Sequence, residues 1–473
     1  MKYIVLSFLI IAFIKLNSQN NVIIKGIAKS YGQEKIVAKI IKEHILYSET
    51  ELANAIINED GSFNISFNVE GTTLVKLYLG NLYSNIYVTK DESYNVIFPN
   101  KDSIPAEIIN FSPLKNIEIK STVYNKDNSI DELNNKIKQI DDEFYRFTKQ
   151  FQNKYADDKK VPLDDFNKIY KSIKVNNPYF SIYSEYKYFF IELYLRKKRD
   201  DILVKEYFHE RPILYDNDQY MNTFNEFFSN YLKKSCLNNE YGKNIIESIN
   251  TYENFDSIVS AFKGDNLIKD KNLFELIVLK GLYEVFYDEA YNQPSIIKIL
   301  NGYLNKTNNE STKIIAKEII NKISATYKGN TAPLIKLPDI NNKLINIREY
   351  DDKLVYLMFF ESLTPIVTED LFLIKEMYNK YNKNVEFISV CPNSIKKQLN
   401  KLISNNGLEW TFILTSNNSI YEQYHISNYP SYFLLDKSNK FISAPSKSPT
   451  EGVDNIFNAM FNKKDKEIEK GGN

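Results

Sequence analysis

An apolar run at residues 354–360, LVYLMFF, constrains the fold more than any other segment. It has the length and the β-branched and aromatic content of a strand that is buried on both faces. A short loop follows, and the segment 368–381 then has apolar residues at the spacing of one helix face: Leu371, Ile374, Met377 and Tyr378. The sequence therefore predicts a buried strand, a loop and a helix in that order.

The start of this helix is the place where chemistry is expected. Thr364 or Thr368 is the predicted N-cap, with Glu369 and Asp370 in the first turn. Backbone N–H groups and the helix dipole converge on any side chain that lies at such an N-terminus.

Residues 327–463 resemble the thioredoxin-like superfamily, and within it the TlpA-type and AhpC/TSA-type domains of bacterial envelopes, including those of Bacteroidetes. The resemblance rests on consecutive matches: GNTAPLIKLPDINNKLINIREYDDKLVYLMFF, VEFISVCPNS, WTFIL, SIYEQYHI and NYPSYFLLDKSNKFI. It implies a thioredoxin-like α/β fold with a cis peptide bond before Pro430 and a final hairpin.

The redox motif of that family is missing. Its Cys-x-x-Cys positions fall on Thr364 and Val367, with Pro365 and Ile366 between them. Only a thiolate attacks a disulfide, and the thiol of a peroxiredoxin would also fall near Val367. No cysteine lies between residues 237 and 390, so a shifted alignment does not restore the motif. We therefore expect no dithiol chemistry and no catalytic residue in this loop.

The first residues have the features of an export signal. Residues 1–19 combine Lys2, an apolar run too short to span a bilayer, and a polar end at Ser18, which predicts a secretory signal peptide. A buried N-terminal element or an uncleaved anchor is the alternative. No cysteine follows the run as a lipidation site. The expected location is the periplasm or another exported compartment, with a soluble mature chain and no membrane span.

Length and charge narrow the partners. The 473 residues are enough for about three domains. Lys and Arg total 60 and Asp and Glu total 60, which favours neither nucleic acid nor an anionic membrane. Cys236 and Cys391 fall in segments assigned to different domains, so their spacing predicts no disulfide.

The remaining chain predicts a multidomain α+β protein. Residues 21–122 carry short alternating runs separated by turn signals such as Asp60-Gly61, which predicts an N-terminal β-sandwich. This part resembles the small β domain that precedes thioredoxin-like domains in Bacteroidetes envelope proteins, although an unrelated β module remains an alternative. Residues 464–473 form a charged tail.

Residues 128–326 predict a central α-helical bundle. Ser129 and Glu132 fit a capping box, and the following helix has one apolar face: Leu133, Ile137, Ile140 and Phe144. Helices are also expected near 179–199, 218–235, 240–262, 267–290 and 311–326, with breaks at Asn177-Pro178, Arg211-Pro212 and Gln293-Pro294. The aromatic stripe at 179–195 fits core packing better than an apolar peptide groove.

Few other residues are candidates for a catalytic, metal or cofactor site. His44, His209 and His425 are isolated, so we expect no metal site, and no motif indicates a cofactor. Cys391 ends a predicted strand; a packed apolar side chain is the simpler reading, and a free reactive thiol is the alternative.

The leading hypothesis is a redox-inactive, exported thioredoxin-fold module that binds a protein or peptide client. In the family, the backbone of the residue before the cis-proline pairs with an extended peptide, and that residue is Tyr429. The expected surface combines Thr364, Pro365, Tyr429 and Pro430. The alternatives are a thiol-disulfide or peroxide-handling enzyme that uses Cys391 or Cys236, and a purely structural scaffold.

Overall fold

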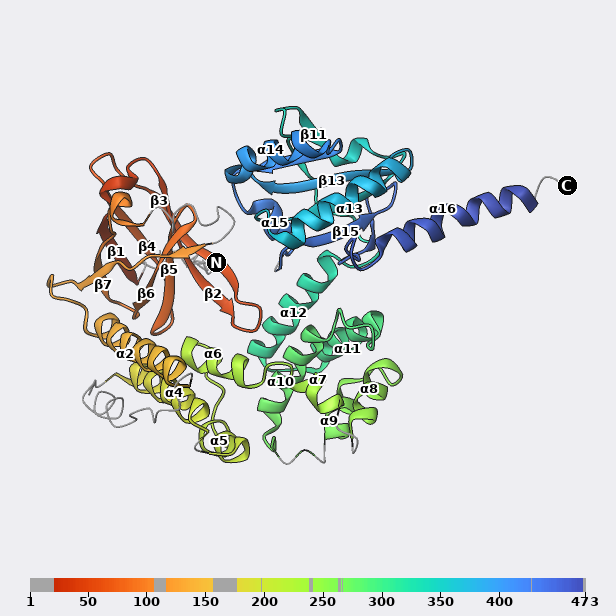
Figure 1. The fold of residues 1–473 in the computed structure, drawn as a ribbon. Coiled ribbons are helices and arrows are strands. Elements are labelled where there is room, and N and C mark those ends of the chain that lie inside the picture. Colours follow the sequence, from red (N-terminus) through yellow and green to blue (C-terminus); the bar gives the residue numbers. More distant parts are fainter. Residues whose placement is uncertain are drawn as a thin grey trace, which may run out of the picture.

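The computed structural model describes residues 21–105, 116–155, 177–196, 198–237, 241–262, 265, 267–426 and 428–470. The predicted signal peptide, 1–19, lies outside them. Along the described chain, strands come first, a run of helices follows, and alternating strands and helices form the last part (Figure 1).

The strands of the first part form two sheets. One has the order β4-β1-β7-β9 and the other the order β3-β2-β5-β6-β8. Apolar side chains from both sheets share one core, in which Ile24 of β1 and Ile36 of β2 are fully buried. The strands and short 3-10 helices are β1 Val22–Ile27, η1 Lys29–Tyr31, β2 Lys35–Glu43, β3 Ser48–Ile56, β4 Ser62–Phe67, β5 Thr73–Leu79, β6 Leu82–Val88, β7 Ser93–Ile97, η2 Lys101–Ser103, β8 Ile117–Glu118 and β9 Thr122–Asn125.

Strand β3 was not predicted from the sequence. None of its side chains is buried, so it lacks the alternating pattern that marks a half-buried strand. It forms because it pairs antiparallel with β2 along almost its whole length. The predicted turn at Asp60-Gly61 is present, and Gly61 has a φ of +82°, a value that favours glycine.

Helices fill residues 132–325 of the described chain. They are α2 Glu132–Tyr155, α4 Pro178–Tyr194, α5 Asp200–Tyr207, α6 Asp218–Phe227, α7 Tyr231–Cys236, α8 Gly242–Asn250, α9 Phe255–Ala261, α10 Lys271–Glu284, α11 Gln293–Lys306 and α12 Glu310–Ala325. Asparagine side chains cap several N-termini by accepting a backbone N–H of the first turn: Asn177, Asn217, Asn254, Asn292 and Asn309.

Two predictions in this part are wrong. The N-cap of α2 is Asp131, whose carboxylate accepts the N–H of Asn134 at 2.9 Å, and not Ser129 with Glu132 as a capping box. The sequence predicts a break at Gln293-Pro294, but helix α11 begins there. Proline fits the first turn of a helix, because the N–H that it lacks would have no partner within the helix there. The predicted apolar face of α2 is confirmed by its buried residues: Leu133, Ile137 and Ile140.

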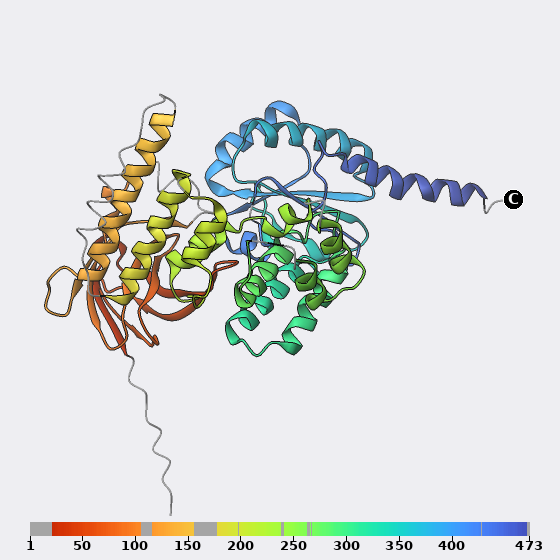
Figure 2. The same ribbon diagram turned by 90° about the horizontal axis from the view of Figure 1, so that it is seen from below.

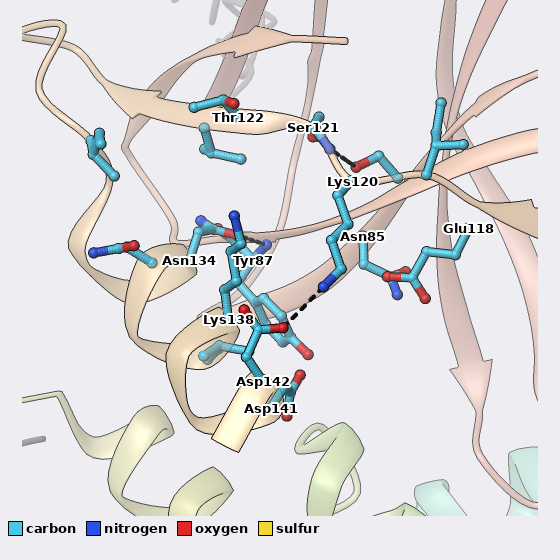
Figure 3. Close-up of a pocket in the computed structure, with 16 residues that line it drawn as sticks. Asn85, Tyr87, Glu118, Lys120, Ser121, Thr122, Asn134, Lys138, Asp141 and Asp142 are labelled. Carbon is cyan, nitrogen blue, oxygen red and sulfur yellow. Dashed lines mark hydrogen bonds and ion pairs between the residues drawn. The ribbon is translucent and has the colours of Figure 1, made fainter. Parts of the chain in front are cut away.

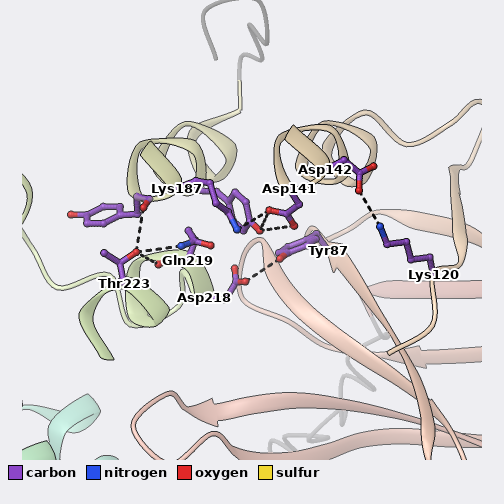
Figure 4. Close-up of polar contacts among 10 residues, drawn as sticks. Tyr87, Lys120, Asp141, Asp142, Lys187, Asp218, Gln219 and Thr223 are labelled. Atoms are coloured by element: carbon purple, nitrogen blue, oxygen red, sulfur yellow. Dashed lines mark hydrogen bonds and ion pairs between the residues drawn. The ribbon is translucent and has the colours of Figure 1, made fainter. Parts of the chain in front are cut away.

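A cluster of polar side chains around the buried Asp218 joins the second sheet to the helices (Figure 4). Asp218 of α6 accepts hydrogen bonds from Tyr87 of β6 at 3.0 Å and from Tyr179 of α4 at 2.5 Å. Asp141 of α2 accepts from Tyr183 of α4 at 2.8 Å. Burial raises the pKa of the Asp218 carboxyl, and both tyrosine hydroxyls oppose that rise. These bonds connect elements far apart in the sequence.

The aromatic stripe at 179–195 packs inside the helical part. Tyr186 and Phe189 are at most 1% exposed and belong to its core. The interpretation as core packing is confirmed for these residues.

The last part contains a five-stranded sheet with the order β14-β13-β12-β15-β16. Strands β12, β13 and β14 are parallel, and β15 runs antiparallel to β12. The elements are β10 Lys336–Pro338, β11 Leu344–Asn346, η4 Ile347–Glu349, β12 Leu354–Phe359, α13 Pro365–Tyr381, β13 Val385–Pro392, η5 Asn393–Ile395, α14 Lys396–Asn406, β14 Thr411–Thr415, α15 Ser419–Gln423, β15 Ser431–Leu435, β16 Phe441–Ser443 and α16 Val453–Lys470. Helix α16 thus includes the start of the predicted charged tail.

The central strand is buried on both faces, as predicted. Tyr356 and Met358 face a core that also contains apolar residues of α13, α14 and α16. Val355, Leu357 and Phe359 face a second core with α15 and the β10–β11 hairpin. Alternate side chains of a strand point to opposite faces, so one apolar run serves both cores.

The helical part meets this sheet directly. Helix α12 leads into it, and Gly329 just beyond α12 donates its N–H to the carbonyl of Phe441 in β16 at 2.7 Å. Figure 1 places the end of α12 against this part of the molecule, and Figure 2 shows the green helical part beside the blue last part. None of the described helices has the length and apolar composition needed to cross a membrane.

Candidate functional site

The two positions of the missing cysteines have separate structural roles. Thr364 is the N-cap of α13, and its hydroxyl accepts the N–H of Val367 at 3.3 Å. Val367 is 2% exposed and packs in the core beneath the helix. Neither side chain can form a mixed disulfide.

Of the two predicted N-caps of α13, Thr364 is the one that the structure shows. Pro365 occupies the first turn of the helix, which leaves Thr364 as the cap and Thr368 inside the helix. The first turn therefore carries no acidic residue, so the prediction that Glu369 and Asp370 lie there is wrong. Ile366 projects from this turn and is 61% exposed.

The peptide bond between Tyr429 and Pro430 is cis, as the resemblance implies. Neither the N–H nor the C=O of Tyr429 forms a hydrogen bond to any other residue that the structure describes. Its ring is half-buried and meets Tyr421 edge to face, with 5.8 Å between ring centroids. Burial, together with the nearby charge of Glu361, raises the pKa of the Tyr429 hydroxyl to about 12.

A cavity of about 580 Å³ lies beside these two segments. Ile366 of α13 and Pro430 line it, whereas Thr364, Pro365 and Tyr429 do not. Thr364 and Pro365 are exposed, so the surface around the vacated redox loop is open to solvent.

Part of the cavity lining comes from the helical part of the chain. These residues lie at and after the end of α10, in the last turn of α12 and directly after it: Tyr283, Tyr287, Lys322 and Thr326. The loop before α16 contributes Ser446, Ser448 and Thr450. These lining residues were not predicted, because helix periodicity does not tell which face of one domain packs on another.

Asp370 is a buried carboxylate at the edge of the cavity. It is 1% exposed and accepts a hydrogen bond from the hydroxyl of Tyr432 in β15. It also accepts from the N–H of Thr450 at 3.3 Å and from its hydroxyl at 3.2 Å. Because these donors hold both oxygens, Asp370 connects α13, β15 and the loop before α16.

Neither cysteine is placed for nucleophilic chemistry. Both are unbridged. Cys391 lies in β13 with no exposed surface, and burial raises the pKa of its thiol. Cys236 at the end of α7 is half-buried, and burial raises the pKa of its thiol as well. A thiolate is scarce at neutral pH in such surroundings.

The histidines form no shared site. His44 and His425 are buried to different extents, and burial lowers the pKa of each ring to about 4. Across the described residues, no group of three or more His, Cys, Asp or Glu side chains has the arrangement of a metal site.

A second hollow, of about 200 Å³, lies between α2 and strands β6, β8 and β9 (Figure 3). Lys120 and Asp142 form an ion pair across it at 3.0 Å, and the hydroxyls of Ser84 and Ser121 lie 2.7 Å apart. None of the predicted site residues lines it.

Comparison with known proteins found matches in the last part of the chain. The family model described as AhpC/TSA matches residues 328–443. The thiol-disulfide oxidoreductase ResA of Geobacillus thermodenitrificans is 25% identical over 118 residues, which are 25% of this chain and 68% of that protein. ResA of Bacillus subtilis is 22% identical over 127 residues, 27% of this chain and 71% of that protein.

Solved structures with detectable similarity include the thioredoxin domain of a thiol-disulfide oxidoreductase from Bacteroides vulgatus. It has 18% identity and a TM-score of 0.25, covering 28% of this chain and 95% of that one. A thiol:disulfide interchange protein from Bacteroides sp. has 17% identity and a TM-score of 0.27, covering 29% and 92%. From the family-model match and the curated relatives, residues 328–443 of this chain are a member of the thioredoxin-like superfamily.

Proposed function

We propose that residues 327–463 form a non-catalytic thioredoxin-fold module that binds an extended segment of a protein or peptide. The binding surface comprises Thr364, Pro365, Tyr429 and Pro430. The observation that carries the proposal is the Tyr429 backbone, whose N–H and C=O have no hydrogen-bond partner among the described residues, beside an open cavity. Such a backbone edge is what an added peptide strand requires.

The loss of both thiols supports binding without redox turnover. Thr364 caps the helix and Val367 fills the core, so the loop keeps its shape without sulfur. The competing proposal, a thiol-disulfide or peroxide-handling enzyme, depends on Cys391 or Cys236. The burial of Cys391 and the raised pKa of both thiols weigh against it.

The proposal extends to location and organisation. A signal peptide at 1–19 would export the chain to the periplasm or another extracytoplasmic compartment. The β-sandwich at 21–122 and the helical bundle at 128–326 would then present the thioredoxin-fold module to its client. A purely structural role for the module is less well supported, because the helices leave an open cavity next to Pro430.

A peptide array tests the proposal. The purified chain is applied to an array of extended peptides, and the best binders are titrated against Tyr429→Pro and Tyr429→Ala. Tyr429→Pro removes the backbone N–H, so we expect about a tenfold loss of affinity, the value of one hydrogen bond. Tyr429→Ala keeps the N–H and serves as the control. Equal affinities for the two variants, both folded by circular dichroism, would refute strand pairing at this position.

A further inference from the structure

The cavity beside Pro430 has one unpaired cation on its helical wall. Lys322 of α12 is half-buried, and its ammonium forms no ion pair or hydrogen bond with any residue in the described part of the chain. Burial lowers the pKa of this ammonium, while the charge of Glu43 opposes the shift. A partly desolvated cation without a direct ion-pair partner is costly, and an incoming carboxylate would relieve that cost.

None of the other charged groups of the cavity described below pairs with Lys322, so an acidic side chain of a ligand can bind there. His425 is kept neutral at physiological pH, because burial and Lys322 lower its pKa to about 4. Asp370 is held by hydrogen bonds from Tyr432 and Thr450. Glu451 accepts the N–H of Ser448 at 2.8 Å. Asp370 lies in α13 and Glu451 in the loop before α16. Each carboxylate repels an acid beside it, which leaves Lys322 as the partner of an incoming acidic side chain.

A buried hydroxyl gives a second, independent sign that something polar enters. Ser446 is 6% exposed, lines the cavity, and its Oγ makes no hydrogen bond to another described residue. A buried hydroxyl left without a partner keeps its desolvation penalty uncompensated. A peptide group of a bound segment would supply the missing partner.

The cavity also offers apolar contact next to the cation. Ile366 of α13 is 61% exposed and Tyr287, just after α10, is 43% exposed, and both line the cavity. Its volume of about 580 Å³ falls in the range of roughly 300–1,000 Å³ that is typical of ligand sites.

From this arrangement we propose that the cavity selects the client by sequence. It accepts an extended peptide in which one acidic side chain pairs with Lys322 and a neighbouring apolar side chain lies between Ile366 and Tyr287. This inference rests on the proposed peptide binding at Tyr429 and adds the chemistry of the partner. Because the 60 basic and 60 acidic residues of the chain balance, selection depends on this local cation and not on a general field.

A library of synthetic nonapeptides, acetylated and amidated at their ends, provides the test. For each binder, matched versions with Glu and Gln at one position are titrated against the full-length chain. We expect one position at which Glu binds about tenfold more tightly than Gln, as for a charge-assisted hydrogen bond. Lys322→Met should abolish this preference. With Lys322→Glu, a peptide that carries Lys at the same position should bind more tightly than the Gln version.

The matched control is Lys317→Glu, which makes the same charge change at an exposed position of the same helix, outside the cavity. It should leave the Glu preference unchanged. Thermal melting identifies any variant that fails to fold, and Lys322→Met then replaces Lys322→Glu.

The outcomes separate the two proposals. An unchanged Glu preference in Lys322→Met, or none in the wild type, with binding still sensitive to Tyr429→Pro, would overturn the acidic-peptide inference alone. If no peptide binds in a way that depends on Tyr429, both proposals fail.

Discussion

Restoring cysteines at positions 364 and 367 tests whether this helix N-terminus still has the electrostatics of a redox site. Thr364 is exposed at the N-cap, so a thiol placed there by T364C lies where the helix dipole stabilises a thiolate. Thiols at helix N-termini titrate at about 3.5–7.5, against about 8.5 for a free cysteine. With a pKa of about 6.5, roughly three quarters of the thiol would be ionised at pH 7, against about 3% of a free cysteine thiol with a pKa of about 8.5.

The expected gain in rate is smaller than the gain in thiolate. About 25-fold more thiolate is offset by an intrinsic nucleophilicity that falls about eightfold over two pKa units, which leaves about threefold in alkylation rate. The pH midpoint of alkylation is therefore the sharper measurement. The thiol introduced by V367C should be protected, because Val367 is 2% exposed.

The stability cost should be tolerable. Losing the threonine cap costs about 1 kcal/mol. Replacing a core valine by cysteine costs at most about 1.5 kcal/mol. Together these remain below the stability of about 5–15 kcal/mol that is usual for a folded protein.

The assay is alkylation by iodoacetamide between pH 4 and pH 10, read at each cysteine by mass spectrometry. Ser362→Cys is the matched control, an exposed position in the same loop but outside the helix. T364C should titrate well below the control, and T364C/V367C should accelerate the reduction of insulin by dithiothreitol. Identical midpoints for T364C and Ser362→Cys would refute the electrostatic reasoning.

Three further predictions concern buried polar groups, each read from urea unfolding. Asp370→Ala should lower the free energy of unfolding by about 1–3 kcal/mol, because it leaves the buried hydroxyl of Tyr432 without an acceptor, and Asp370→Asn should cost less; equal costs would contradict this. Asp218→Ala should cost about 2–5 kcal/mol by stranding two tyrosine hydroxyls, again more than Asp218→Asn. His44 is 7% exposed and its pKa is lowered from 6.5 to about 4, so the unfolded chain takes up its proton first as the pH falls. Stability should fall by about 3 kcal/mol between pH 6.5 and pH 4 through this group, and His44→Gln should flatten that slope; an unchanged slope would contradict it.

The sequence predicted the elements whose side chains carry a clear burial pattern. Strand β12 was recognised because it is apolar at every position, which follows from its burial on both faces. Strand β3 was missed because none of its side chains is buried, and helix α11 was missed because Pro294 was read as a break. Pairing with β2 determines strand β3, and the capping side chain of Asn292 together with Pro294 in the first turn determines the start of helix α11.

The site divides in the same way. The loss of both thiols follows from residue identity alone, and the cis bond before Pro430 was implied by the resemblance to the thioredoxin-like superfamily. The cavity was not predicted, because Lys322 and Tyr287 come from the helical part and Ser446 from the loop before α16. Such contacts between distant segments carry no local pattern.

Insulin-disulfide reduction by the wild-type chain tests the central claim most directly. The rate of insulin precipitation in dithiothreitol is compared with and without the purified protein, using T364C/V367C as the positive control. Because both native thiols are buried or half-buried and have raised pKa values, we predict that the wild type matches the dithiothreitol background. Acceleration that disappears on substitution of Cys236 or Cys391 would contradict a function without sulfur chemistry.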